Sequence, residues 1–76
     1  MPDLPRVSGR EAVRAFQRAG WEVARQRGSH VVLVKPGCIY SLSIPLHSIL
    51  GPGLLRDLIR KAGLSIEEFV DLLREK

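Results

Sequence analysis

WEVARQRGSHVVLVKPGCIYSLSIP, residues 21–45, contains three strand-like runs separated by two turn signals. Gly28-Ser29 separates the first run from the second, and Pro36-Gly37 separates the second from the third. Glycine and proline favour the backbone angles of tight turns. Because short turns join consecutive strands as antiparallel neighbours, this stretch predicts a three-stranded antiparallel meander.

The predicted strands cover residues 21–27, 30–35 and 39–44, and Pro45 ends the third. The middle run is rich in β-branched residues, which favour strands. The third run alternates and is therefore expected to be half-buried, with its apolar residues on one face. Two sets of side chains are each predicted to share one side of their strand: Trp21, Val23, Arg25 and Arg27 in the first, and Tyr40, Leu42 and Ile44 in the third.

Helical patterns flank the meander and predict helices at residues 8–20, 52–63 and 65–76. The first and the last open on the Ser-x-x-Glu pattern of a capping box. The middle helix begins at a proline, which suits a first turn, and glycines at positions 20 and 63 supply stop signals. The side chains predicted to form the buried stripe of the middle helix are Leu54, Leu55, Leu58, Ile59 and Ala62.

The predicted order is therefore α-β-β-β-α-α, in the α+β class. A three-stranded antiparallel sheet with the helices packed on one face is the simplest way to bury these apolar surfaces. A chain of 76 residues buries a thin core, so residues 1–76 are expected to form a single domain.

The charge distribution favours a polyanionic partner. The chain carries a formal net charge of +4, and a basic balance promotes binding to nucleic acid. Residues 1–62 carry a net +6, whereas residues 63–76 carry a net −2. Any nucleic-acid surface is therefore expected on the first four-fifths of the chain.

Several classes of protein are disfavoured. Cys38 is the single cysteine, so no disulfide forms within the chain and a cysteine-based zinc site is not expected. Two histidines with no carboxylate at ligand-like spacing predict no metal site, and a chain of 76 residues leaves little room for a cofactor pocket, so no cofactor is expected. Residues 1–5 lack the regions of a signal peptide, and no apolar run approaches the roughly 20 residues of a membrane span. A cytoplasmic protein without membrane contact is expected.

The candidate for chemistry is His30, which follows Arg25, Arg27 and Ser29 around the first turn. Histidine both accepts and donates protons near neutral pH. Cleavage of RNA needs little more than this, because the 2′-OH is an internal nucleophile. A base, a cation for the phosphate and a proton for the leaving oxygen suffice. The alternative is that His30 is an ordinary hydrogen-bonding strand residue.

A second basic feature is the stripe Arg10, Arg14 and Arg18, spaced by four residues on the first predicted helix. One interpretation is a solvated helix face. The other is a ridge that contacts successive phosphates, as on a helix that binds double-stranded RNA.

Five segments of the chain resemble the HicA family of toxins, the YcfA-like mRNA interferases of HicAB toxin–antitoxin systems. They are SGRE at 8–11, AGWEV at 19–23, RGSH at 27–30, IPLH at 44–47 and the closing segment 53–65. They occur in the family's order and span nearly the whole chain.

The resemblance implies a fold like that of the double-stranded-RNA-binding domain and the function of a type II toxin that cleaves mRNA without a metal. It implies His30 as the catalytic histidine and a HicB-type antitoxin as partner. His47 matches a family position to which we assign a structural role, bracing its loop. Arg25 and Arg27 would hold the phosphate, Ser29 would orient the site, and the helix arginines would bind RNA. The alternatives are a non-catalytic RNA-binding module and a protein-interaction domain with a basic face.

Overall fold

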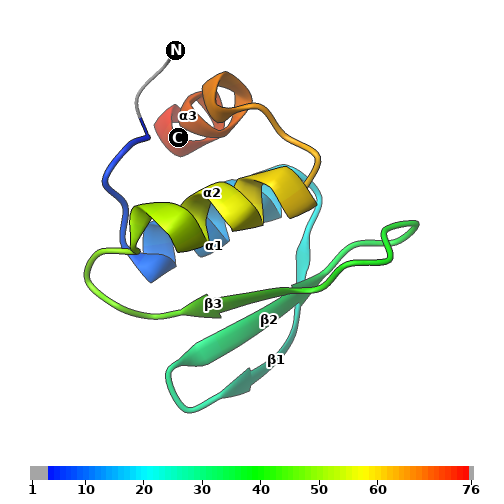
Figure 1. The fold of residues 1–76 in the computed structure, drawn as a ribbon. Coiled ribbons are helices and arrows are strands. Elements are labelled where there is room, and N and C mark those ends of the chain that lie inside the picture. The colour runs from blue at the N-terminus through cyan, green and yellow to red at the C-terminus, as the bar shows by residue number, and fades with distance from the viewer. Residues whose placement is uncertain (1–3, 76) are drawn as a thin grey trace.

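The computed structural model describes residues 4–75 and has the predicted α+β architecture (Figure 1). The predicted order of elements is confirmed. The helices and strands are α1 (Gly9–Arg18), β1 (Glu22–Arg27), β2 (His30–Val34), β3 (Leu42–Pro45), α2 (Pro52–Lys61) and α3 (Ile66–Arg74). Both predicted capping boxes are present, with Ser8 paired to Glu11 and Ser65 paired to Glu68.

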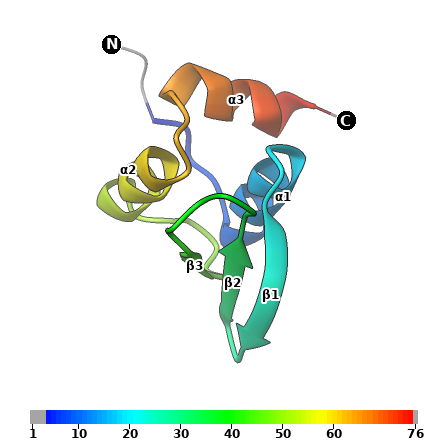
Figure 2. The same cartoon turned by 90° about the vertical axis from the view of Figure 1, so that its right-hand side faces the viewer.

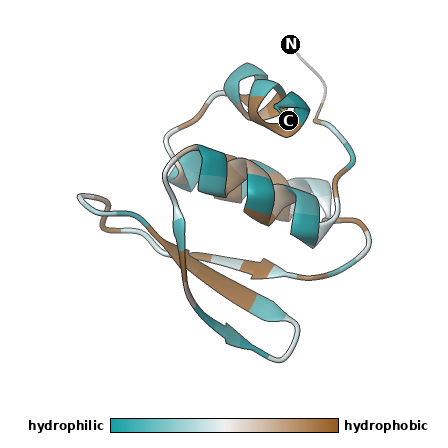
Figure 3. Cartoon of the chain, turned by 180° about the vertical axis from the view of Figure 1, so that it is seen from behind, coloured by the Kyte–Doolittle hydropathy of each residue, from teal (hydrophilic) through white to brown (hydrophobic). Residues whose placement is uncertain are grey.

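The three strands form one antiparallel sheet in the order β1-β2-β3. The side chains that β2 and β3 send toward the helices are buried: Val31, Leu33, Leu42 and Ile44. Every residue of β1 is exposed, and Figure 3 shows β1 hydrophilic along much of its length beside a hydrophobic β2. One face of the sheet is thus covered, and its opposite face is open.

The helices form two layers above the covered face (Figure 2). α1 and α2 lie over the sheet, and α3 packs on the two of them. Phe16 of α1 and Phe69 of α3 join these layers, since both side chains are fully buried and their ring centroids lie 5.1 Å apart. Tilted aromatic pairs at this separation stabilise a core beyond their buried area.

The sequence prediction is wrong in one detail of β3 and one detail of α2. The third strand begins at Leu42 rather than at residue 39, and Tyr40 is half exposed instead of facing the core. On α2 the buried residues are Leu55, Leu58 and Ile59, whereas Leu54 is 39% exposed. Tyr40 lies in the connection before β3, and Leu54 lies on α2 beside its buried residues, so one apolar side chain of each segment stays outside the core.

Residues 1–3 and 76 lie outside the described part of the chain. Most of the segment 1–5, where no signal peptide is expected, is therefore not described. The same holds for the last residue of the helix predicted at 65–76. Within residues 4–75 no helix has the length and apolar character needed to cross a membrane.

Candidate functional site

His30 is the first residue of β2, at the end of the sheet where β2 is joined to β1 (Figure 1). Its ladder partners are Arg27 on β1 and Pro45 on β3. Successive side chains of a strand point to opposite faces. Since Val31 is buried toward the helices, His30 lies on the open face of the sheet, where it is exposed.

The turn between β1 and β2 brings Arg27 and His30 together. Gly28 has φ 55°, in the left-handed region that a residue with a side chain enters only at a cost. A two-residue loop with glycine in its first position suits the twist of a hairpin. Arg27 and His30 are therefore directly opposite each other, at the Cα separation of about 4.5–5.5 Å typical of ladder pairs.

Arg25 lies on the same open face as Arg27 because the two residues are two positions apart in a regular part of β1. Val23 does not share this face, because β1 contains an irregularity before Arg25. Val23 pairs with Leu33, whereas Arg25 pairs with Val32, so Ala24 is an extra residue without a partner. Such a bulge shifts the alternation of side chains by one position. Val23 and Arg25 consequently lie on opposite faces of the sheet.

The prediction that Trp21, Val23, Arg25 and Arg27 share one side is wrong for this reason. Trp21 precedes the strand and is buried in the core. Val23 faces the helix side of the sheet. Only the two arginines remain on one face, and it is the face of His30.

Ser29 contributes to this end of the sheet through its main chain. The Leu46 N–H donates a hydrogen bond of 2.6 Å to the Ser29 carbonyl, which ties the β1–β2 turn to the chain leaving β3. The sequence analysis expected Ser29 to orient the site; within residues 4–75 the structure shows this main-chain contact and no hydrogen bond from the Ser29 hydroxyl.

His47 follows β3 and is close to His30, with ring centroids 6.5 Å apart in an edge-to-face arrangement. Its side chain is exposed. Its loop is braced through the main chain, because the His47 carbonyl accepts a 2.9 Å hydrogen bond from the Gly9 N–H. The predicted site omitted His47, although the pairing of Pro45 with His30 places the residue two positions beyond Pro45 near the turn.

Gly9 explains how α1 comes so close to this loop. A Cβ at position 9 would lie 2.1 Å from the Pro45 carbonyl oxygen and 2.8 Å from the Leu46 Cα. No other residue fits at this contact without moving the backbone. The start of α1 is thereby held against the end of β3 and the two residues that follow it, Leu46 and His47.

Arg10 and Arg14 lie on the helix side of the sheet. They line a groove of about 240 Å³ between α1 and β1, which also includes Val23 and Gln26. Arg10 and Arg14 therefore border a different surface from Arg25 and Arg27.

Arg18, the third member of the stripe, is already engaged within the protein. Its Nη1 donates a 2.6 Å hydrogen bond to the Leu72 carbonyl near the end of α3. A cation close to the carbonyl end of a helix is favourable. Arg18 therefore links α1 to α3, in contrast to Arg10 and Arg14.

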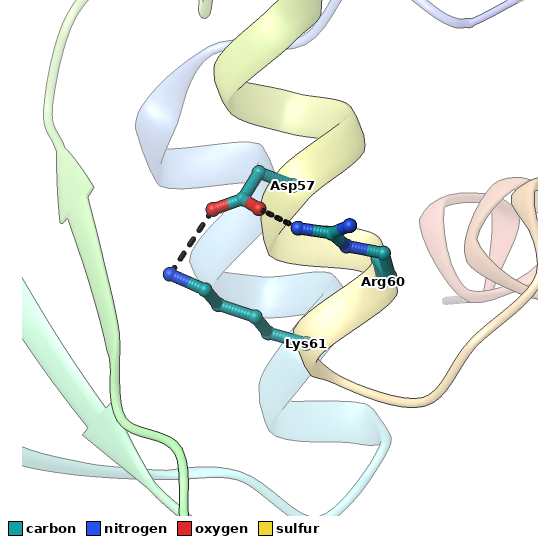
Figure 4. A network of polar contacts seen from close by, with 3 residues as sticks. All are labelled: Asp57, Arg60 and Lys61. Atoms are coloured by element: carbon teal, nitrogen blue, oxygen red, sulfur yellow. Dashed lines mark hydrogen bonds and ion pairs between the residues drawn. The ribbon is translucent and has the colours of Figure 1, made fainter.

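The cations at the end of α2 are also engaged. The Asp57 carboxylate accepts from Arg60 at 2.7 Å and lies 3.1 Å from the Lys61 Nζ (Figure 4). Hydrogen bonds from Lys61 and Arg60 hold the pKa of Asp57 below its ordinary value. Part of the positive charge of α2 is thus balanced locally. On the strand ladder, the cations that share the face of His30 are Arg27, its direct partner, and Arg25.

No group of three or more metal-ligating side chains gathers within the described residues 4–75. Comparison with known protein families gives a match of residues 9–64 to the family described as HicA toxin of bacterial toxin-antitoxin. No curated protein matches the sequence.

Proposed function

The chain belongs to the HicA toxin family of bacterial toxin–antitoxin systems, and from this premise we propose that it is a metal-independent endoribonuclease that cleaves mRNA with His30. As a member of that family it is the toxin of a pair and has an antitoxin partner. The proposed antitoxin is of the HicB type, binding the basic face of the toxin.

The observation that supports the proposal most is the pairing of His30 with Arg27 on the open face of the sheet. RNA brings its own nucleophile, so a shallow surface is sufficient for the reaction. His30 exchanges a proton with a reacting oxygen, and a guanidinium beside it stabilises the charge that develops on the phosphate. Arg25, on the same face, adds a second cation for the phosphate backbone.

The groove along α1 supports a separate role in binding. Arg10 and Arg14 lie on the other side of β1 from His30, so RNA that contacts both surfaces would wrap around the end of the sheet. Arg18 adds to the positive field there while it holds Leu72. If this binding occurs without cleavage, the chain is an RNA-binding module of the same fold.

The proposal is tested with purified protein and a labelled mRNA fragment. We expect cleavage that persists in excess EDTA, because His30 and its arginines carry the proton transfer and the charge stabilisation without a metal. The control is a known magnesium-dependent nuclease, which EDTA must silence in the same buffer. Activity that EDTA removes and magnesium restores would contradict the proposal, and binding without cleavage would favour the RNA-binding module.

Arg14 is expected to contribute to RNA binding, and Arg27 is expected to contribute to the chemical step. Arg14→Ala should weaken RNA binding and flatten the slope of log affinity against log salt by about 0.7–0.9, as for one lost phosphate contact. Its cleavage rate at saturating RNA should stay near that of the wild type. Arg27→Ala should lower the saturated rate, because the charge formed in the transition state loses its partner.

The measurements are RNA affinity and single-turnover cleavage across a salt series. Arg74→Ala is the matched control, since it removes the same charge from the exposed end of α3. Equal losses of saturated rate in the Arg14 and Arg27 variants would refute the division of roles. An unchanged slope for Arg14→Ala would assign the helix stripe to solvation.

A further inference from the structure

Two histidines, not one, lie at the reactive end of the sheet. The His30 and His47 ring centroids are 6.5 Å apart, and both side chains are exposed. No hydrogen bond joins the two rings in the described residues. At this separation each ring has a nitrogen free to reach a different oxygen of one phosphodiester, within a hydrogen-bond distance of about 2.6–3.2 Å.

The chain holds His47 in place from two sides. The N-terminus of α1 donates from Gly9 to the His47 carbonyl at 2.9 Å, and the preceding residue, Leu46, donates to the Ser29 carbonyl at 2.6 Å. The space for a Cβ at Gly9 is filled by the backbone of Pro45 and Leu46. All these contacts use the main chain, so they fix the position of His47 and leave its imidazole free.

We propose that His47 is a second catalytic residue, the general acid that protonates the leaving oxygen, with His30 as the general base. This inference rests on the proposed ribonuclease function. The imidazole of His30 takes the proton of the 2′-OH as the 2′ oxygen bonds to phosphorus. The bond from phosphorus to the 5′ oxygen breaks, and the imidazolium of His47 gives its proton to that oxygen. The products are a 2′,3′-cyclic phosphate and a 5′-hydroxyl.

The position of His30 in the sheet assigns the two roles in this proposal. His30 lies between Arg27 on β1, its direct ladder partner, and the end of β3, which His47 follows. The base is therefore placed at His30, beside the guanidinium that stabilises the phosphate, and the acid at His47.

Cleavage of two substrates distinguishes a general acid at position 47 from a residue that only positions the other groups of the site. The first is an all-oxygen RNA dinucleotide, and the second has sulfur in place of the bridging 5′ oxygen. A thiolate leaves without a proton, so the second substrate does not require a general acid. On the all-oxygen substrate His47→Ala should lose about 10²–10⁴-fold in single-turnover rate. On the 5′-thio substrate it should recover most of that loss, whereas His30→Ala should remain slow on both.

Ser48→Ala is the control variant, since it changes the exposed residue next to His47 and should leave both rates unchanged. Thermal unfolding of His47→Ala should match the wild type, because alanine retains the main-chain hydrogen bonds.

A His47→Ala variant that cleaves the all-oxygen RNA at the wild-type rate overturns this inference while the proposed function stands. A loss without recovery on the 5′-thio substrate, or recovery by His30→Ala instead, also overturns it. A wild-type protein that cleaves neither substrate refutes the proposed function itself.

Discussion

Replacing His30 with alanine is expected to lower the rate of RNA cleavage by about 10²–10⁴-fold, the usual contribution of general acid–base catalysis. The fold should survive, because His30 is exposed at the start of β2 and no hydrogen bond of its ring appears among residues 4–75. RNA affinity should change little, since the arginines on both surfaces remain. Expressed without an antitoxin, the variant should no longer arrest growth.

The measurement is single-turnover cleavage at saturating RNA, together with RNA affinity and the unfolding midpoint. Ser43→Ala is the matched control, because Ser43 pairs with Val32 and so occupies the same open face, away from the β1–β2 turn. It should cleave like the wild type. An unchanged rate for His30→Ala would refute the catalytic assignment.

The sequence predicted the elements well where their signals are local. A capping box is completed within four residues, so Ser8 and Ser65 identify the starts of α1 and α3 without knowledge of the rest of the fold. Gly28 identifies the first turn in the same way, because the backbone angle that it adopts is costly for other residues.

The errors arose where side-chain position depends on packing. The bulge at Ala24 reverses the faces of β1 relative to simple alternation, and no turn or glycine signal in the strand marks it. Leu54 and Tyr40 fit the apolar pattern of their segments yet remain exposed. In each case the tertiary arrangement, and not the local period, decides what is covered.

The candidate site was predictable in part. A two-residue turn after Arg27 makes it the direct partner of His30, so this contact follows from hairpin geometry alone. The approach of His47 needs the register between β2 and β3, which the sequence does not specify. The engagement of Arg18 with Leu72 requires α3 to pack on α1, and no periodicity reveals it.

The second large effect is expected at Gly9, which appears in the sequence analysis only as part of the SGRE segment at 8–11. In Gly9→Ala the new methyl group would meet the Pro45 carbonyl oxygen at 2.1 Å and the Pro45 carbonyl carbon at 2.9 Å. Both are backbone atoms, so no flexible side chain can yield, and α1 must move away from the end of β3. That movement also breaks the Gly9 hydrogen bond to the His47 carbonyl. We expect a loss of about 3 kcal/mol or more in the free energy of unfolding.

Urea unfolding of Gly9→Ala and Gly53→Ala gives the comparison. Both glycines lie in the first turn of a helix, but a Cβ at Gly53 meets nothing within 4 Å. Alanine there should be neutral or stabilising by up to about 1 kcal/mol, because it favours the helix. Similar midpoints for the two variants would show that α1 does not depend on this close contact. If the contact does hold the end of β3, the folded fraction of Gly9→Ala should also cleave RNA slowly, because the backbone that must shift is the one that carries His47.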